Sequence, residues 1–307
     1  MSLKQENDKL TEFKKYPKLA PELHHHVLTY LRGATLENYA ECSKYCNSEI
    51  QRFNTTAPKI VSIGDVDDGV DVTLYYESQC LRRGFSIVTK KIPKFEMEQF
   101  ISKVYKYVNH GNTKELLINM KKWPTKVLEH EYLSRIDCLR VSMYASIYDD
   151  FMEYLKKSNL PNELALGEPP NHKFILPAKF FKSSEFKKLQ NVYLTLPHQI
   201  DDDDFINLQN PGISLRCSKS FEVVRQKMHQ IVENTPTNFQ FLRLILPKDN
   251  PRFFDIDIDE LFPSERFPNR SVDNLGQRRI GDLRIKTENA PFKPNGWVHI
   301  QHKSVSP

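Results

Sequence analysis

The first part of the chain shows a helical spacing of apolar residues. From Tyr16 onward, Leu19, Leu23, Val27 and Leu31 recur at every fourth position, which places them on one face of a short helix. Two further short helices are predicted before residue 55. Three helices within fewer than about 45 residues enclose little interior, so we expect a small module that leaves apolar surface exposed.

The next segment, 57–91, has the apolar runs and turn residues of short strands. Strands are predicted at 60–63, 70–76 and 85–89. Asp68-Gly69 and Arg83-Gly84 supply turns between them. The pattern predicts a small antiparallel sheet.

From residue 95 onward, short apolar strands alternate with helix-like segments. Strand candidates lie at 116–118, 139–141, 164–166, 192–196, 213–215, 242–246 and 283–285. Helices are predicted at 95–108, 148–155, 202–208 and 221–232. Most successive strands are roughly 21 to 29 residues apart, the period of leucine-rich-type repeats. This alternation predicts an α/β fold in which a parallel sheet curves as a βα solenoid.

Strand alternation also selects candidate binding residues. Because side chains alternate between the two faces of a strand, Leu139 and Val141 pointing inward send Arg140 outward. The same reasoning selects a set that we expect to bind a target protein: Arg140, Tyr193, Arg216, Arg243, Arg284 and Lys286. The outward positions include no carboxylate in this interpretation, and guanidinium groups suit an acidic or phosphorylated target. The alternative is that exposed strand positions are simply polar.

Composition narrows the classes of protein. The 307 residues are 39% hydrophobic, which is enough for a packed core. The net charge is +5, and the sequence lacks the dense basic stripe of a dedicated nucleic-acid binder. The charged and polar residues 1–15 are typical of a flexible arm and not of a signal peptide. No apolar stretch of the sequence is long enough to span a membrane. Five scattered cysteines favour a reducing compartment. We expect a cytoplasmic or nuclear protein.

The segments that resemble catalytic or metal-binding motifs each lack a required residue or have a simpler interpretation. His130-Glu131 starts like a zinc-protease helix, but Ser134 occupies the second ligand position. The segment 65–71 resembles a calcium loop less than it resembles a hairpin turn. Three further groups of possible metal ligands are better interpreted as solvated, packed or helix-terminal side chains. They are His24 to His26, the pair Cys42 and Cys46, and the run Asp201 to Asp204. We therefore expect neither enzymatic activity nor a cofactor nor a bound metal.

The helical module resembles an F-box. The resemblance rests on Tyr16-Pro17-Lys18-Leu19-Ala20-Pro21-Glu22-Leu23, on Val27-Leu28-Thr29-Tyr30-Leu31, on Leu36, and on Cys42-Ser43-Lys44-Tyr45-Cys46. F-boxes dock through an apolar face onto the Skp adaptor of cullin–RING ubiquitin ligases. The resemblance implies a set of adaptor-binding residues: Leu19, Pro21, Leu23, Val27, Leu28 and Leu31.

The remainder resembles the C-terminal F-box-associated region of the large nematode-expanded F-box families. This resemblance rests on the segments 189–194, 202–205 and 280–285, in that order behind the F-box-like module. It gives a domain plan of four parts: an arm at 1–15, an F-box at 16–55, an F-box-associated α/β domain at 56–290 and a C-terminal tail at 291–307.

The resemblance implies a substrate-receptor subunit of a ubiquitin ligase. Its partners would be a Skp-type adaptor, a cullin held through that adaptor, and an unknown target protein. Two alternatives remain open: an ordinary amphipathic helix in place of the F-box, and a leucine-rich-type interaction scaffold without any ligase role. An enzyme is the third interpretation.

Overall fold

The computed structural model describes most of the chain beyond residue 57. The described residues are 58–78, 84–107, 113–129, 133, 136–157, 159–169, 171–247, 258–272, 278–288 and 295–302. The predicted F-box at 16–55, with all six predicted adaptor-binding residues, lies outside them. The chain divides into two compact units, one ending at Asp137 and the other beginning at Cys138.

The first unit contains the predicted antiparallel sheet. Its strands are β1 (Ile60–Val66), β2 (Gly69–Ser78), β3 (Gly84–Ile92) and β4 (Glu115–Asn119). β1, β2 and β3 pair antiparallel in chain order, whereas β4 pairs parallel to the other edge of β1. The first turn falls one residue earlier than predicted, because Gly69 already pairs with Val66. A Cβ atom at Gly69 would lie 2.4 Å from the carbonyl oxygen of Ile92, so this strand position requires glycine.

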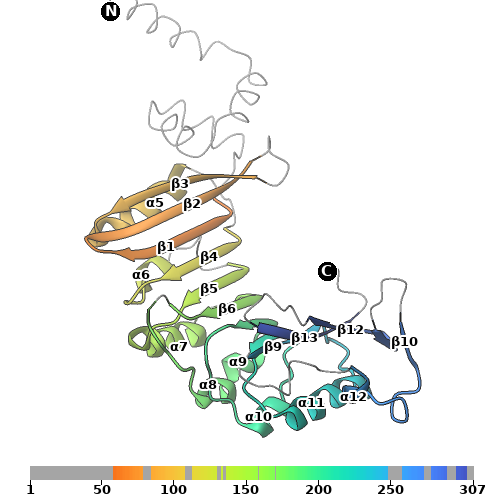
Figure 1. Ribbon diagram of the computed structural model, residues 1–307. Coiled ribbons are helices and arrows are strands. Elements are labelled where there is room, and N and C mark those ends of the chain that lie inside the picture. Colours follow the sequence, from red (N-terminus) through yellow and green to blue (C-terminus); the bar gives the residue numbers. More distant parts are fainter. Residues whose placement is uncertain are drawn as a thin grey trace, which may run out of the picture. The chain divides into compact units, whose positions relative to one another are not determined.

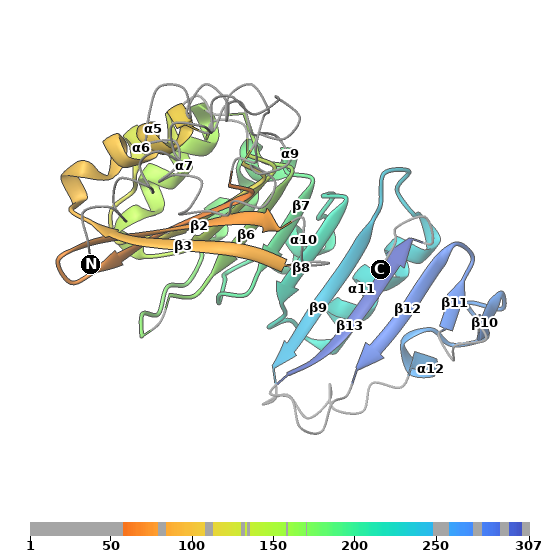
Figure 2. The same ribbon diagram turned by 90° about the horizontal axis from the view of Figure 1, so that it is seen from above.

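Alternate residues of this sheet form the core of the first unit. Val61, Ile63, Val72 and Leu74 are fully buried, while their strand neighbours are partly exposed. Three helices accompany the sheet: η2 (Lys94–Glu96), α5 (Met97–Tyr107) and α6 (Thr125–Leu128). The apolar face predicted for α5 is buried at Met97, Ile101 and Val104, and Figure 2 shows α5 and α6 on the same side of the strands.

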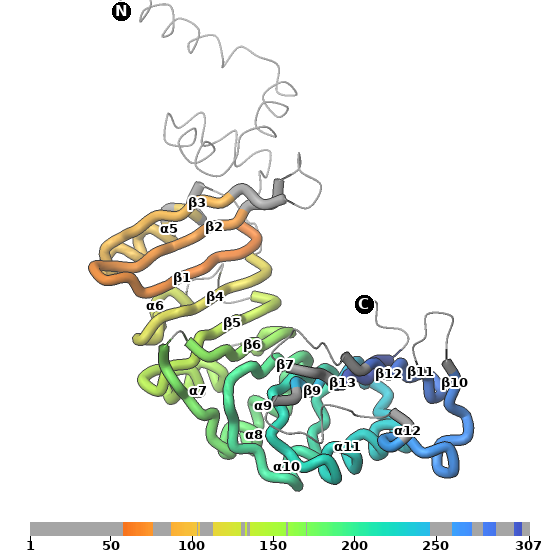
Figure 3. The backbone as a smooth tube through the Cα atoms, viewed as in Figure 1, coloured from red at the N-terminus to blue at the C-terminus, as the bar shows by residue number. Residues whose placement is uncertain are grey.

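The second unit begins with a series of parallel strands. They are β5 (Cys138–Ser142), β6 (Glu163–Gly167), β7 (Asn191–Leu194), β8 (Gly212–Arg216) and β9 (Phe241–Pro247). Each strand pairs with the next one in the chain, and Figure 3 traces the successive returns of the backbone. Every strand predicted in this stretch is therefore present, and the mixed α/β class with a large sheet is confirmed.

Helices connect the parallel strands on one side of the sheet. They are α7 (Tyr148–Lys157), preceded by η3 (Ala145–Ile147), and α8 (Ala178–Lys182), α9 (Ser184–Lys188), α10 (Asp202–Ile206) and α11 (Phe221–Glu233). Figure 1 shows them along a single face. The rings of Phe180, Phe181 and Phe186 pack 5.1 to 5.5 Å apart beneath the strands. Ser183 and Ser220 cap α9 and α11, since each hydroxyl accepts a hydrogen bond from a backbone N–H of the first turn.

The sheet of the second unit ends differently from the prediction. The segment 283–285 was expected to continue the parallel series, and 291–307 was expected to be a tail. Instead β13 (Asn295–His302) lies between β9 and β12 (Leu283–Glu288) and runs antiparallel to both. Short antiparallel strands β11 (Arg278–Ile280) and β10 (Arg270–Val272) complete this edge, and α12 (Ile258–Leu261) precedes them.

The reason for this difference is the free edge of β9. A parallel strand with no neighbour on one edge exposes a row of unpaired N–H and C=O groups. β13 pairs with that edge although α12, β10, β11 and β12 separate it from β9 along the chain. Val298 and Ile300 of β13 are buried, at 1% and 0% exposure. None of the helices in the described ranges combines the length and apolar character needed to cross a bilayer.

Ile300→Ala tests the position of β13 in the core. Removing a fully buried isoleucine side chain is expected to lower the free energy of unfolding by about 2–5 kcal/mol, as measured by urea denaturation. Glu265→Ala, at an exposed turn between α12 and β10, is the control and should have little effect. An unchanged stability of the Ile300 variant would restore the interpretation of this segment as a tail.

Candidate functional site

One face of the sheet in the second unit gathers the predicted target-binding residues. Leu139, Leu164, Val192 and Leu242 point toward the helices and are buried. The residues after them in each strand point to the opposite face, which we call the polar face. The strand register gives a row across this face from β5 to β12: Arg140, Ala165, Tyr193, Ser214, Arg243, His299 and Lys286.

All six predicted residues lie on the polar face. Four of them belong to this row, and Arg216 and Arg284 lie two residues away from it on β8 and β12. Arg140, Arg216 and Arg243 are exposed. Tyr193, Arg284 and Lys286 are half-buried. The basic side chains thus occur toward both ends of the row, with Ala165, Tyr193 and Ser214 between Arg140 and Arg243.

The expectation that this face carries no carboxylate is wrong. Glu163 lies two residues before Ala165 on β6 and therefore shares the polar face. Burial of Tyr193 is the main cause that raises the pKa of its hydroxyl. The negative charge of Glu163 raises this pKa as well, whereas the positive charge of Arg140 lowers it. The first residue of β6 had not been assigned to the strand from the sequence, so its outward direction was missed.

An aromatic ladder crosses the polar face, formed by Tyr193, Phe241 and His299. The ring centroids of Tyr193 and Phe241 are 5.7 Å apart, and those of Phe241 and His299 are 6.0 Å apart at nearly right angles. Figure 2 shows β9 and β13, which carry Phe241 and His299, side by side in front of α11. The sequence signalled only Tyr193, because Phe241 stands at the very start of its strand.

Gly212 makes the contact between Tyr193 and Phe241 possible. These residues belong to β7 and β9, which lie on either side of β8, so their backbones are about 10 Å apart. A Cβ atom at Gly212 would lie 2.6 Å from Cε1 of Phe241 and 2.0 Å from Oδ1 of Asn191. The missing side chain therefore leaves the space that the ring of Phe241 occupies on its way to Tyr193. Ser214, the next outward residue of β8, is only 5% exposed.

The electrostatics of this face keep His299 uncharged at neutral pH. Burial, and after it the nearby charges of Arg243 and Lys286, together lower its pKa to about 4. The imidazole thus acts as a polar aromatic surface between two cations. Such a surface suits a polypeptide segment that carries both acidic and apolar side chains.

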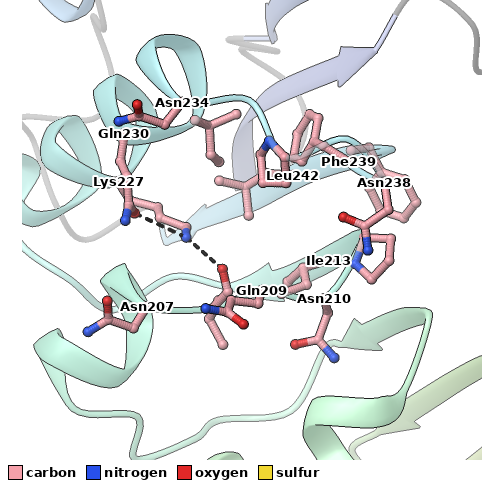
Figure 4. Close-up of a pocket in the computed structure, with 15 residues that line it drawn as sticks. Asn207, Gln209, Asn210, Ile213, Lys227, Gln230, Asn234, Asn238, Phe239 and Leu242 are labelled. Carbon is pink, nitrogen blue, oxygen red and sulfur yellow. Dashed lines mark hydrogen bonds between the residues drawn. The ribbon is translucent and has the colours of Figure 1, made fainter.

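A pocket of about 320 Å³ opens at the edge of the sheet where β8 and β9 begin (Figure 4). Its apolar lining includes Pro211, Ile213, Ile231, Phe239 and Leu242. Five exposed amide side chains also line it: Asn207, Gln209, Gln230, Asn234 and Asn238. Sequence patterns could not reveal this pocket, because its residues come from α11, from β8 and β9, and from the loops that precede these two strands.

The one charged residue in the lining of this pocket is Lys227. It is 5% exposed, and burial lowers its pKa to about 8. Its amino group donates hydrogen bonds to the carbonyl oxygens of Ile206 and Leu208, at 2.7 and 2.8 Å. It also donates to Oε1 of Gln230 at 3.4 Å. Lys227 therefore caps the end of α10, and its N–H groups are directed at two backbone carbonyls and at one neighbouring side chain.

Residues considered as metal ligands have other partners. Asp65 accepts a hydrogen bond from the backbone N–H of Lys121 and pairs with Lys94. Asp201 and Asp204 pair with Lys182, and the acidic run begins α10 as predicted. Among the described residues, no group of three or more His, Cys, Asp or Glu side chains is placed to hold a metal ion. His24 to His26, Cys42, Cys46 and His130 lie outside that part of the chain.

Cys138 and Cys217 are buried, and neither forms a disulfide with another described residue. Burial raises the pKa of the Cys217 thiol to about 11, as expected for a thiol that acts as a small core residue.

Comparison with protein-family models, with curated proteins and with solved structures found no match for this chain.

Gly212→Ala tests the construction of the polar face. The added methyl group must displace Asn191 or Phe241, so we expect the free energy of unfolding to fall by roughly 1–3 kcal/mol. Gly167→Ala is the matched control on β6, since its Cβ would meet nothing closer than 3.6 Å. Urea denaturation of both variants measures the difference, and equal stabilities would contradict the proposed role of Gly212.

Proposed function

We propose that this protein is a substrate-receptor subunit of a cullin–RING ubiquitin ligase. In this proposal the F-box-like segment 16–55 binds the Skp adaptor through Leu19, Pro21, Leu23, Val27, Leu28 and Leu31. The polar face binds a target protein. The chain itself catalyses no reaction; it raises the concentration of target lysines near the loaded ubiquitin-conjugating partner, in the cytoplasm or the nucleus.

The observation that carries the proposal is the shared polar face. The six residues selected from the sequence come from five strands, and the register places all of them on one side of one sheet. The other side is covered by helices. This arrangement supports interpreting β5 to β9 as a leucine-rich-like βα solenoid, a class that commonly binds partners on the sheet surface.

The aromatic ladder adds to this support. Protein-binding surfaces are enriched in Tyr, Phe and Arg relative to the rest of the surface, with Lys and Glu depleted at their centres. Tyr193 and Phe241 at the centre, with Arg140 and Arg243 on either side, follow that distribution. A scaffold without a ligase role would use the same surface, so the adaptor distinguishes the two functions.

Changing Leu23 and Val27 to Asp tests adaptor binding. Pressing two carboxylates into an apolar interface is expected to reduce affinity for the Skp adaptor at least about a hundredfold. Co-purification of the full chain with the adaptor measures the loss, and an unchanged melting temperature shows that the second unit keeps its fold. Adaptor recovery at the wild-type level would show that the F-box interpretation of 16–55 is wrong, whereas a wild-type chain that recovers no adaptor would favour the scaffold.

Changing Arg216 and Arg243 to Glu tests the polar face. Both side chains are exposed, so the fold should be retained, while charge reversal should remove an acidic target and leave adaptor binding intact. The measurement is affinity purification read by mass spectrometry, with the Leu23 and Val27 variant as the reciprocal control. Identical sets of co-purified proteins for wild type and the arginine variant would contradict target binding at this face.

A further inference from the structure

We propose that the pocket beside α11 binds one apolar side chain of an extended, uncharged peptide segment, whose peptide groups hydrogen-bond to the amide side chains at the pocket. The inference uses the proposed function only to say that the segment belongs to a target protein. The pocket itself is independent of the F-box-like region.

The size of the pocket selects the kind of ligand. A volume of about 320 Å³ is at the small end of the range for ligand pockets, which extends from roughly 300 to 1,000 Å³. Ile213, Phe239 and Leu242 give it an apolar interior, as Figure 4 shows. This space suits one large aliphatic or aromatic side chain better than a cofactor or a nucleotide.

The polar lining selects an uncharged, amide-bearing ligand. An amide side chain offers both a donor and an acceptor, and these match the C=O and N–H of a peptide group. Gln209, Asn234 and Asn238 are exposed. Their amide groups form no hydrogen bond to another residue in the described part of the chain. The lining contains no Asp, Glu or Arg, and the N–H groups of Lys227 are directed at backbone carbonyls.

The wall of the pocket is held in place before any ligand binds. The loop 207–211 forms this wall and is fixed by two buried polar side chains. Lys227 holds the carbonyls of Ile206 and Leu208, while Asn210 donates to the carbonyls of Phe186 and Leu189 at 2.7 and 2.9 Å. A wall ordered in advance loses little entropy on binding, which favours recognition of a small group.

Phe241 connects the pocket to the polar face. It lines the pocket, and its ring also contacts Tyr193 and His299 in the aromatic ladder. A segment that lies along the ladder can therefore place one side chain over the start of β9 and into the pocket. The pocket and the basic residues of the polar face would then bind neighbouring parts of one target segment.

The test uses blocked amino acids as probes on the full chain. N-acetyl-leucine methylamide and N-acetyl-phenylalanine methylamide are titrated while chemical shifts of the protein amides are followed, with N-acetyl-aspartate methylamide as the charged comparison. We expect the apolar probes to bind with a dissociation constant of roughly 1–10 mM, to shift signals of α11 and the loop 207–211, and to exceed the aspartate probe in affinity by about tenfold.

Two double variants complete the design. Asn234→Ala with Asn238→Ala removes two amides of the pocket and should weaken the leucine probe by about fivefold or more. Gln190→Ala with Gln199→Ala removes two exposed amides elsewhere and should not change binding. All four positions are exposed, and melting temperatures check that the fold is kept.

The inference would be overturned if neither apolar probe shifted the protein amide signals up to about 50 mM, where a site of the expected affinity would be largely filled. It would also be overturned if both double variants bound the leucine probe equally, or if the aspartate probe bound more strongly than the apolar probes. None of these results depends on the adaptor. A negative result here therefore leaves the ligase proposal standing, and loss of that proposal leaves the pocket result unchanged.

Discussion

The in-register pairing of β5 to β9 is the constraint on which the rest of the second unit depends. Because strand side chains alternate strictly, the burial of Leu139, Leu164, Val192 and Leu242 against the helices fixes the direction of every residue between them. A slip of one residue in any strand would bring its charged or polar positions into the core. The apolar contacts therefore stabilise the fold and, by the same geometry, determine the composition of the polar face.

Two small features adapt this regular frame for binding. Gly212 removes a side chain from the centre of the polar face and lets aromatic rings from non-adjacent strands meet. Lys227 brings an ammonium group into a nearly buried position, which is costly unless it is hydrogen-bonded. The carbonyls at the end of α10 offset that cost and, in return, the loop beside the pocket is fixed.

The parallel series has a definite end. The second edge of β9 would otherwise expose unpaired backbone groups, and the chain pairs it with β13 in the opposite direction. The antiparallel pairing of β13 brings His299 next to Arg243 and Lys286. The end of the sheet is thus also the place where the cationic and aromatic parts of the polar face meet.

The sequence by itself determined the elements whose signal is local. Apolar runs of strand length and helical spacing located β5 to β9, α7 and α11, and alternation assigned Arg140 and Arg243 to the outer face, because these patterns depend only on neighbouring residues. The F-box-like segment is likewise a sequence inference. Only the tertiary structure decided the position of β13, the contact of Tyr193 with Phe241 and the pocket beside α11. These depend on residues far apart in the chain, on the absence of a side chain at Gly212 and on loops whose course packing sets, and no local periodicity encodes them.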